Sequence, residues 1–283
     1  MTSVARYRWL LLASIAAIVL SACGSGGDPR ASVVDAAHKT AALRWVRYQV
    51  QFSGSHLLPA ADDVTGARGA YDFRTENDYA FVALRRRGGG PQELEFFNSA
   101  PNSFELSPSP IPAGLLPAGK TSISVQFPGS DPAGASGALA AQVEGMAPLL
   151  TLEEIEWGTR AVSSLGTRPI GHAATDEYRV SVDLARAASA ASTHGDAAVA
   201  AAIEHELDAT GSGRLTIDAW VDGPGYIAQI VAATPGSDLG TTELSFLSYS
   251  LPYTGGWPPA SQLVPLASLK PGRRSVWTVA TGS

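Results

Sequence analysis

The regular alternation of apolar and polar residues is the feature that most constrains the fold of this chain. Every second residue from Val46 to Phe52 is apolar, and the residues between them are arginine or glutamine. The same two-residue period recurs from Tyr178 to Leu184. Successive side chains of a strand point to opposite faces of a sheet, so this pattern indicates strands with one buried face. An apolar face of this kind is what any sheet needs to form a core.

Shorter runs of the same kind predict further strands, joined by turn residues and interrupted by helices. The predicted strands are residues 71–74 and 79–84 around a turn at Asn77-Asp78, 94–97, 104–106, 122–127, 161–165 and 170–174 around a turn at 166–169, 215–221, 226–232 and 242–246. Helices are predicted at 33–43, with a capping box that starts at Ser32, at 138–146, at 148–155, and from Asp196 to Gly211.

The amino terminus has the pattern of an export signal. Arg6 and Arg8 precede an apolar run at residues 9–20, which is too short for a permanent transmembrane helix and typical of a signal peptide. Leu20-Ser21-Ala22-Cys23 resembles the lipobox of bacterial lipoproteins. The resemblance implies that residues 1–22 are removed and that the Cys23 thiol carries diacylglycerol. The alternative is an ordinary signal peptide that ends near a cysteine.

The lipobox predicts the domain organisation and the location of the protein. Residues 23–31 would comprise the lipidated cysteine and a flexible tether, 32–269 a single domain, and 270–283 an unpatterned tail that is a candidate for disorder. Two acyl chains satisfy the requirement for stable attachment. We therefore expect a domain that is lipid-anchored to the outer, extracytoplasmic face of the cell membrane.

Composition excludes several classes of protein. The chain has 20 basic and 26 acidic residues, and loss of Arg6 and Arg8 leaves 18 basic residues and a net charge of -8. This acidic balance argues against a nucleic-acid-binding or polybasic membrane-binding protein. Cys23 is the only cysteine, so the lipidated chain has no thiol for a disulfide, a thiolate metal site or a nucleophile.

Residues 114–121 match the phosphate-loop pattern G-x-x-x-x-G-K-[ST], but their context argues against nucleotide binding. That pattern functions between a buried strand and a helix N-terminus. Here the preceding residues 107–112 are rich in proline, so we expect a loop over 107–117 and no central strand. The following residues 122–127 alternate as a strand does and do not predict a helix.

No pattern in the chain predicts an enzyme, a metal site or a cofactor. The sequence has no G-x-S-x-G elbow, no H-E-x-x-H pair and no calcium loop. Glu204-His205-Glu206 lacks the second histidine of a zinc-binding helix, and we expect a structural role for His172 on a strand. A secreted hydrolase is therefore the less favoured alternative. The five histidines are scattered over His38, His56, His172, His194 and His205.

The order of predicted elements, together with the lipobox, resembles the LolA-like fold and specifically the actinobacterial LppX/LprG-type lipoproteins. The resemblance is carried by residues 46–54, residues 178–184, Ala219-Trp220-Val221-Asp222, and Pro258-Pro259-Ala260-Ser261. It implies an α+β fold in which a strongly curved antiparallel sheet forms a half-barrel. Helices would cover the concave face, and the apolar cavity beneath them would hold acyl chains.

The resemblance implies a non-catalytic, membrane-anchored monomer that binds or carries a lipid or glycolipid and can deliver it to an envelope transporter. A structural role in the core remains the alternative for each candidate ligand-binding residue. A second alternative for the protein is an envelope sensor or interaction module of the same fold with no lipid cargo. We expect a solvated loop at the Arg85–Arg87 tip. The candidate ligand-binding residues are Val46, Tyr48, Val50, Phe52, Tyr71, Phe73, Val180 and Val182.

Overall fold

The structure is a computed structural model, and it describes the part of the chain that carries the predicted sheet. Outside the described residues lie the signal peptide, Cys23, the helix predicted at 138–146 and the tail at 270–283. The described residues are 27–53, 62–86, 91–100, 103–109, 114, 116–126, 148–233, 240–252, 255, 257–265 and 268–269.

Twelve strands form one sheet in the order β12-β6-β5-β4-β3-β2-β1-β11-β10-β9-β8-β7. The strands are β1 (Trp45–Ser53), β2 (Asp62–Asp72), β3 (Asn77–Arg86), β4 (Pro91–Ala100), β5 (Ser103–Ser109), β6 (Ser122–Gln126), β7 (Thr159–Ile170), β8 (Ala173–Asp183), β9 (Arg214–Asp222), β10 (Ile227–Ala233), β11 (Thr241–Tyr249) and β12 (Leu263–Pro265). All neighbours are antiparallel except β12 and β6.

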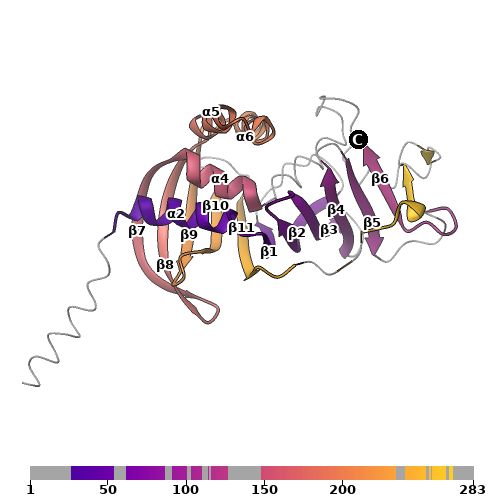
Figure 1. Cartoon of the computed structure of the whole chain (residues 1–283), viewed down its shortest axis with the longest axis horizontal. Coiled ribbons are helices and arrows are strands. Elements are labelled where there is room, and N and C mark those ends of the chain that lie inside the picture. Colours follow the sequence, from indigo (N-terminus) through magenta and orange to yellow (C-terminus); the bar gives the residue numbers. More distant parts are fainter. Residues whose placement is uncertain are drawn as a thin grey trace, which may run out of the picture.

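Two consecutive meanders meet at the centre of this sheet. The chain runs outward from β1 through β2 to β6, crosses to the opposite edge at β7, and returns through β8 to β11. The last of these strands pairs with β1, so β1 joins the two halves. Figure 1 shows the sheet curving across its width, with β7 to β11 bent around α2.

The described residues contain four α-helices. They are α2 (Pro29–Ala41), α4 (Pro148–Gly158), α5 (Leu184–His194) and α6 (Ala197–Thr210). Of these, α2 and α4 lie against one face of the sheet, and α5 and α6 pack beside α4. Helices α2 and α4 pack against each other and mainly on β7 to β10, whereas α5 packs between α4 and α6. The predicted α+β class, with a curved antiparallel sheet and helices on its concave face, is confirmed.

The register places the apolar side chains on the helix-facing side. Val50 pairs with Leu244 of β11 and with Ala67 of β2, which in turn pairs with Val82 of β3. Residues paired across neighbouring strands share a face. All four belong to one buried apolar cluster that extends over both halves of the sheet and into the helices. One continuous hydrophobic face therefore holds the fold together.

Several local predictions were wrong because a nearby residue provides a better boundary. The first helix begins at Pro29, since the Asp28 side chain accepts a hydrogen bond from the amide of Arg30, and Ser32 is therefore not the cap. Residues 29–31 are thus helical rather than part of the tether. Helix α5 was missed: its buried stripe is Leu184, Ala187, Ala188 and Ala191, and alanine is too weakly apolar to make such a stripe evident in the sequence. Asp196 and Gly211 do cap α6 as predicted.

The predicted turns around two hairpins also need correction. The β2–β3 turn lies at residues 73–76, where Glu76 takes a positive φ of 56°, and Asn77-Asp78 begins β3. Strand β7 continues through residues 166–169, and the chain reverses at Gly171 and His172. A register shift between Ser164 and Gly166 leaves Leu165 without a paired residue, and Gly166 itself pairs with Glu177, so the strand does not end there. His172 consequently lies in a turn and not on a strand.

Residues 107–109 belong to β5, which corrects the predicted loop at 107–117. Strand β6 pairs with β5 only as far as Leu106, so the missing amide hydrogen of Pro108 interrupts no ladder on that side. The phosphate-loop-like segment leads into β6 and not into a helix. Its Lys120 Nζ donates to the carbonyl oxygen of Ser261 at 2.8 Å, which fixes the carboxyl-terminal segment beside β6.

Candidate functional site

The predicted ligand-binding residues all lie in or against the apolar cluster of the concave face, where they form two groups. Six come from β1, β2 and the turn after β2, whereas Val180 and Val182 lie on β8. Three strands separate β1 from β8, so the groups are about 19 Å apart at a strand spacing of about 4.8 Å. A single small pocket cannot contain both groups, although an extended apolar chain could contact both.

The group on β1 and β2 is deeply buried in its middle and more open at its ends. Tyr48 and Val46 are fully buried, whereas Phe52 and Phe73 are only half-buried. Phe73 packs edge-on against Tyr71, with the ring centroids 5.1 Å apart. Phe52 lies toward one end of β1, and Phe73 bonds through its amide to Arg44 just before the other end. The two phenylalanines therefore mark the two ends of this apolar strip.

Two glycines in β2 allow the strands beneath this strip to approach closely. A Cβ atom at Gly69 would collide with the carbonyl oxygen of Tyr79, and one at Gly66 would collide with that of Val50. Gly69 lies opposite Tyr48 on β1 and Ala80 on β3. Sequence reasoning missed these two positions, although glycine within a run of strand residues is a recognised signal of close backbone approach.

A buried carboxyl group lies on the same apolar face. Asp78 is 2 % exposed, and the hydroxyl of Tyr48 donates to its carboxylate, with 2.9 Å to each oxygen. Burial raises the pKa of Asp78 to about 7, while the hydrogen bonds from Tyr48 and from the backbone of Tyr79 oppose this rise. Burial likewise raises the pKa of Tyr48. Sequence reasoning placed Asp78 in a turn and so missed this pair.

A second group of acids lies between α4 and its neighbours. Burial and the negative charges of Asp196, Glu76 and Glu156 raise the pKa of Glu153 to about 8. The adjacent Glu154 is 3 % exposed, and its Oε1 has no hydrogen-bond partner among the described residues.

Glu154 and Glu206 of α6 form a hydrogen-bonded pair of carboxyl groups. Burial is the main cause that raises the pKa of Glu154 well above its ordinary value, and the negative charge of Glu206 raises it further. Burial also raises the pKa of Glu206, and its hydrogen bond with Glu154 lowers it. The two groups therefore share a proton, and a protonated carboxyl donates to a carboxylate across the α4–α6 contact.

We expect the substitution Glu154→Gln to stabilise the protein at pH 8 by about 1 to 2 kcal/mol. The raised pKa of Glu154 means that its contribution to stability is present at low pH and is lost as the pH rises. A glutamine amide can donate to Glu206 at every pH, so the gain should shrink at pH 5. Thermal unfolding at the two pH values measures the difference. Glu204→Gln, an exposed change on α6, the helix that carries Glu206, is the control; equal shifts for both variants would contradict the pairing.

The described histidines do not converge on a reactive centre. His38 contacts Glu156 at 3.2 Å on an exposed surface, and His194 stacks on Trp157 at 5.6 Å between ring centroids. Within the described ranges, no three His, Cys, Asp or Glu side chains are grouped so that they could hold a metal ion. The position of His56 and the side chain of His205 lie outside what the structure describes.

None of the helices in the described part of the chain is both long and apolar enough to cross a membrane.

Comparisons with known proteins give structural neighbours only. No protein-family model and no curated protein sequence matches this chain. LprF from Mycobacterium bovis is 14 % identical, with 81 % of this chain and 97 % of that chain covered and a TM-score of 0.49. The lipoprotein LppX from Mycobacterium tuberculosis is 12 % identical, with 81 % and 98 % covered and a TM-score of 0.48.

A putative outer membrane lipoprotein-sorting protein domain from Vibrio parahaemolyticus is 9 % identical, with 81 % of this chain and 93 % of that chain covered and a TM-score of 0.23. At these identities and TM-scores, the likeness says nothing about ligand or activity.

Proposed function

We propose that this protein is a membrane-anchored, extracytoplasmic domain that binds the acyl chains of a lipid or glycolipid along the concave face of its sheet. The observation that carries the proposal is the extent of the apolar face. The described helices pack mainly on β7 to β10, yet buried apolar side chains continue over the other half of the sheet. Phe96 on β4 and Ile123 on β6 are examples, with exposures of 2 % and 0 %.

The chemistry of this face suits an uncharged tail. Its candidate ligand-binding residues are aliphatic or aromatic, and Asp78, which bonds to Tyr48, is a buried group whose pKa is raised. An acyl chain needs no hydrogen bonds and gains about 0.8 kcal/mol for each buried methylene. Binding by contact area alone also fits a protein for which we propose no catalytic residue.

The proposed anchor and the proposed ligand site suit each other. Acylation of Cys23 would hold the domain at the outer face of the cell membrane, where lipids are its available ligands. From this position the monomer could pass its ligand to a transporter in the same envelope.

Native mass spectrometry of the protein from an actinobacterial host tests the proposal. The unacylated mature chain, which is residues 23–283 with Cys23→Ser, should carry a non-covalent mass in the range of a lipid. Extraction with organic solvent should release that mass and identify the lipid. A bare mass from several preparations would instead favour the sensor or interaction module.

Two substitutions at the ends of the apolar strip should weaken lipid retention without removing its buried middle. Phe52→Asp and Phe73→Asp each place a charge on a half-buried position, and we expect each to reduce the lipid-bound fraction at least about 5-fold, because about 1 kcal/mol or more of contact is lost. Leu247→Asp is the matched control, because Leu247 is 60 % exposed and alternates with the core residue Phe246. Equal lipid loss in all three variants would contradict binding on the concave face.

A further inference from the structure

Four exposed arginines gather at one corner of the molecule, and we call this group the basic corner. It forms where α2, β7, α5 and β9 begin, and its members are Arg30, Arg160, Arg186 and Arg214. The register places Arg214 directly opposite Asp183, the residue that caps α5. Elements that are distant in the sequence therefore bring their positive charges to one place.

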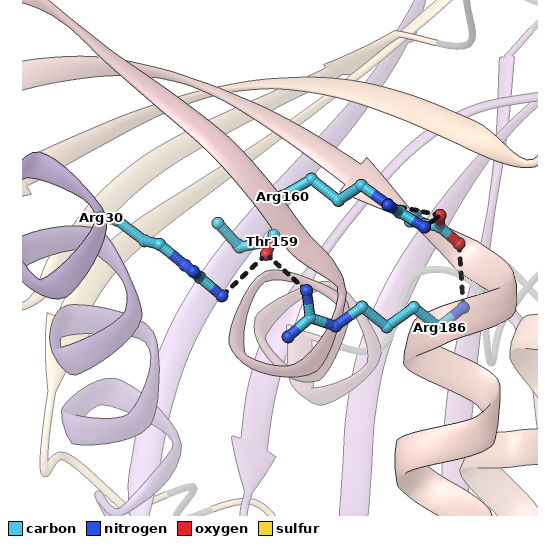
Figure 2. A network of polar contacts seen from close by, with 5 residues as sticks. Arg30, Thr159, Arg160 and Arg186 are labelled. Atoms are coloured by element: carbon cyan, nitrogen blue, oxygen red, sulfur yellow. Dashed lines mark hydrogen bonds and ion pairs between the residues drawn. The ribbon is translucent and has the colours of Figure 1, made fainter.

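Two of these arginines converge on a single backbone atom. Arg30 Nη2 donates to the carbonyl oxygen of Thr159 at 3.2 Å, and Arg186 Nη1 donates to the same oxygen at 3.5 Å. Figure 2 shows the two guanidinium groups reaching Thr159 from different helices. Thr159 is buried at the junction of α4 and β7 and its hydroxyl bonds to the carbonyl of Ile155, so its position is firm. Like charges are thus held close together by a neutral acceptor.

The nearby carboxylates only partly balance this charge. Asp183 accepts from Arg160 Nε at 2.6 Å and from the backbone amide of Arg186 at 2.9 Å. Asp28 bonds to the backbone amide of Arg30. Neither Arg30 nor Arg186 has a carboxylate partner for its guanidinium among the described residues. Four positive side chains thus face two acids, and the amino-terminal ends of α2 and α5 add positive potential.

The basic corner also lies at the place where the chain leaves for its predicted anchor. Helix α2 begins at Pro29, so only residues 24–28 separate the predicted anchor Cys23 from the basic corner, and a flexible linker of that length would span roughly 12 Å. The chain as a whole has a net charge of -6, so an anionic surface would repel most of the domain and attract this corner. The overall charge suggested no membrane affinity, because it averages over a surface on which the arginines are unevenly placed.

We infer that the basic corner binds the anionic headgroups of the phospholipid membrane beside the anchor and thereby sets the orientation of the domain on that surface. The position next to the membrane rests on the acylation of Cys23, which belongs to the proposed function. The contact itself requires neither the anchor nor a bound lipid cargo. Exposed guanidinium groups suit this role because they can form two parallel hydrogen bonds to a phosphate group.

Vesicle co-sedimentation of the unacylated mature chain tests the inference. Vesicles of phosphatidylcholine mixed with phosphatidylglycerol should bind the protein at about 0.05 M salt and release it at about 0.5 M. Vesicles of phosphatidylcholine alone should not bind it. The double variant Arg30→Gln/Arg186→Gln should lose roughly 30-fold in partitioning, from about 1 kcal/mol for each arginine near an anionic surface.

Two further variants separate charge from loss of structure. Arg30→Lys/Arg186→Lys keeps both charges and should retain most of the binding. Arg47→Gln/Arg74→Gln removes two exposed arginines elsewhere and should lose little. Absence of binding to the anionic vesicles, equal binding to neutral vesicles, or an equal loss in the two glutamine pairs would overturn the inference. Failure of the lipid-cargo proposal would appear only in the native mass and would leave these results unchanged.

Discussion

Replacing Gly69 with alanine is expected to destabilise the protein by about 3 kcal/mol or more. The new methyl group would overlap the carbonyl oxygen of Tyr79 and lie 3.0 Å from the Cα atom of Ala80. Both obstacles are backbone atoms of β3, so relief requires β2 and β3 to separate. Because β2 also pairs with β1 at this level, the displacement would disturb the ladder on both sides.

Urea unfolding of the unacylated mature chain measures this loss. The midpoint for Gly69→Ala should fall well below that of the unsubstituted chain, or the variant should fail to accumulate in soluble form. Gly223→Ala is the control, because a Cβ atom at that turn meets nothing within 4 Å. Gly69→Ala with an unchanged midpoint would show that β2 and β3 do not approach as closely as the structure places them.

Removing the titration of Asp78 should produce a large change in how stability depends on pH. The pKa of Asp78 is about 7 in the folded protein, compared with 3.8 for an ordinary aspartate. The folded state therefore keeps a proton that the unfolded chain has already lost between these values. The contribution of Asp78 to stability is full below about pH 4 and declines as the pH rises through 7, by about 4 kcal/mol in total.

Asp78→Asn should abolish the part of the pH-dependent loss of stability that comes from the ionisation of Asp78. The asparagine oxygen can still accept from the Tyr48 hydroxyl, but the side chain no longer ionises. The variant should therefore gain stability relative to the unsubstituted protein between pH 5 and pH 8, as measured by urea unfolding at each pH. Asp35→Asn, at an exposed position on α2, should follow the unsubstituted protein. Parallel curves for Asp78→Asn and the unsubstituted protein would contradict the raised pKa.

Tyr48→Phe provides an independent check on the same group. The Tyr48 hydroxyl donates to the carboxylate of Asp78 and so lowers its pKa. Loss of that hydroxyl should raise the pKa further and move the decline in stability to higher pH. A shift to lower pH would mean that the hydroxyl does not favour the charged form.

Much of the candidate face could be predicted from the sequence, because a strand exposes alternate residues on one side whatever its neighbours are. Val46, Tyr48 and Val50 were predicted to point inward, and they belong to the buried cluster. The same period does not separate a core residue from one that contacts a ligand, since both are apolar. The separation of this group from Val180 and Val182 could not be foreseen, because the order of strands is not a local property.

By itself, the amino-acid sequence determined the strands with one apolar face and the capped helix α6, because periodicity and caps depend on residues a few positions apart, whereas the fold class came from the resemblance to a known family. Only the tertiary structure decided which charges lie together. The Tyr48–Asp78 bond joins residues 30 positions apart, and the contact of Arg30 with Thr159 joins residues 129 positions apart. Burial and proximity across such separations arise from the packing of the whole sheet and its helices, so they give Asp78 its high pKa and the basic corner its charge.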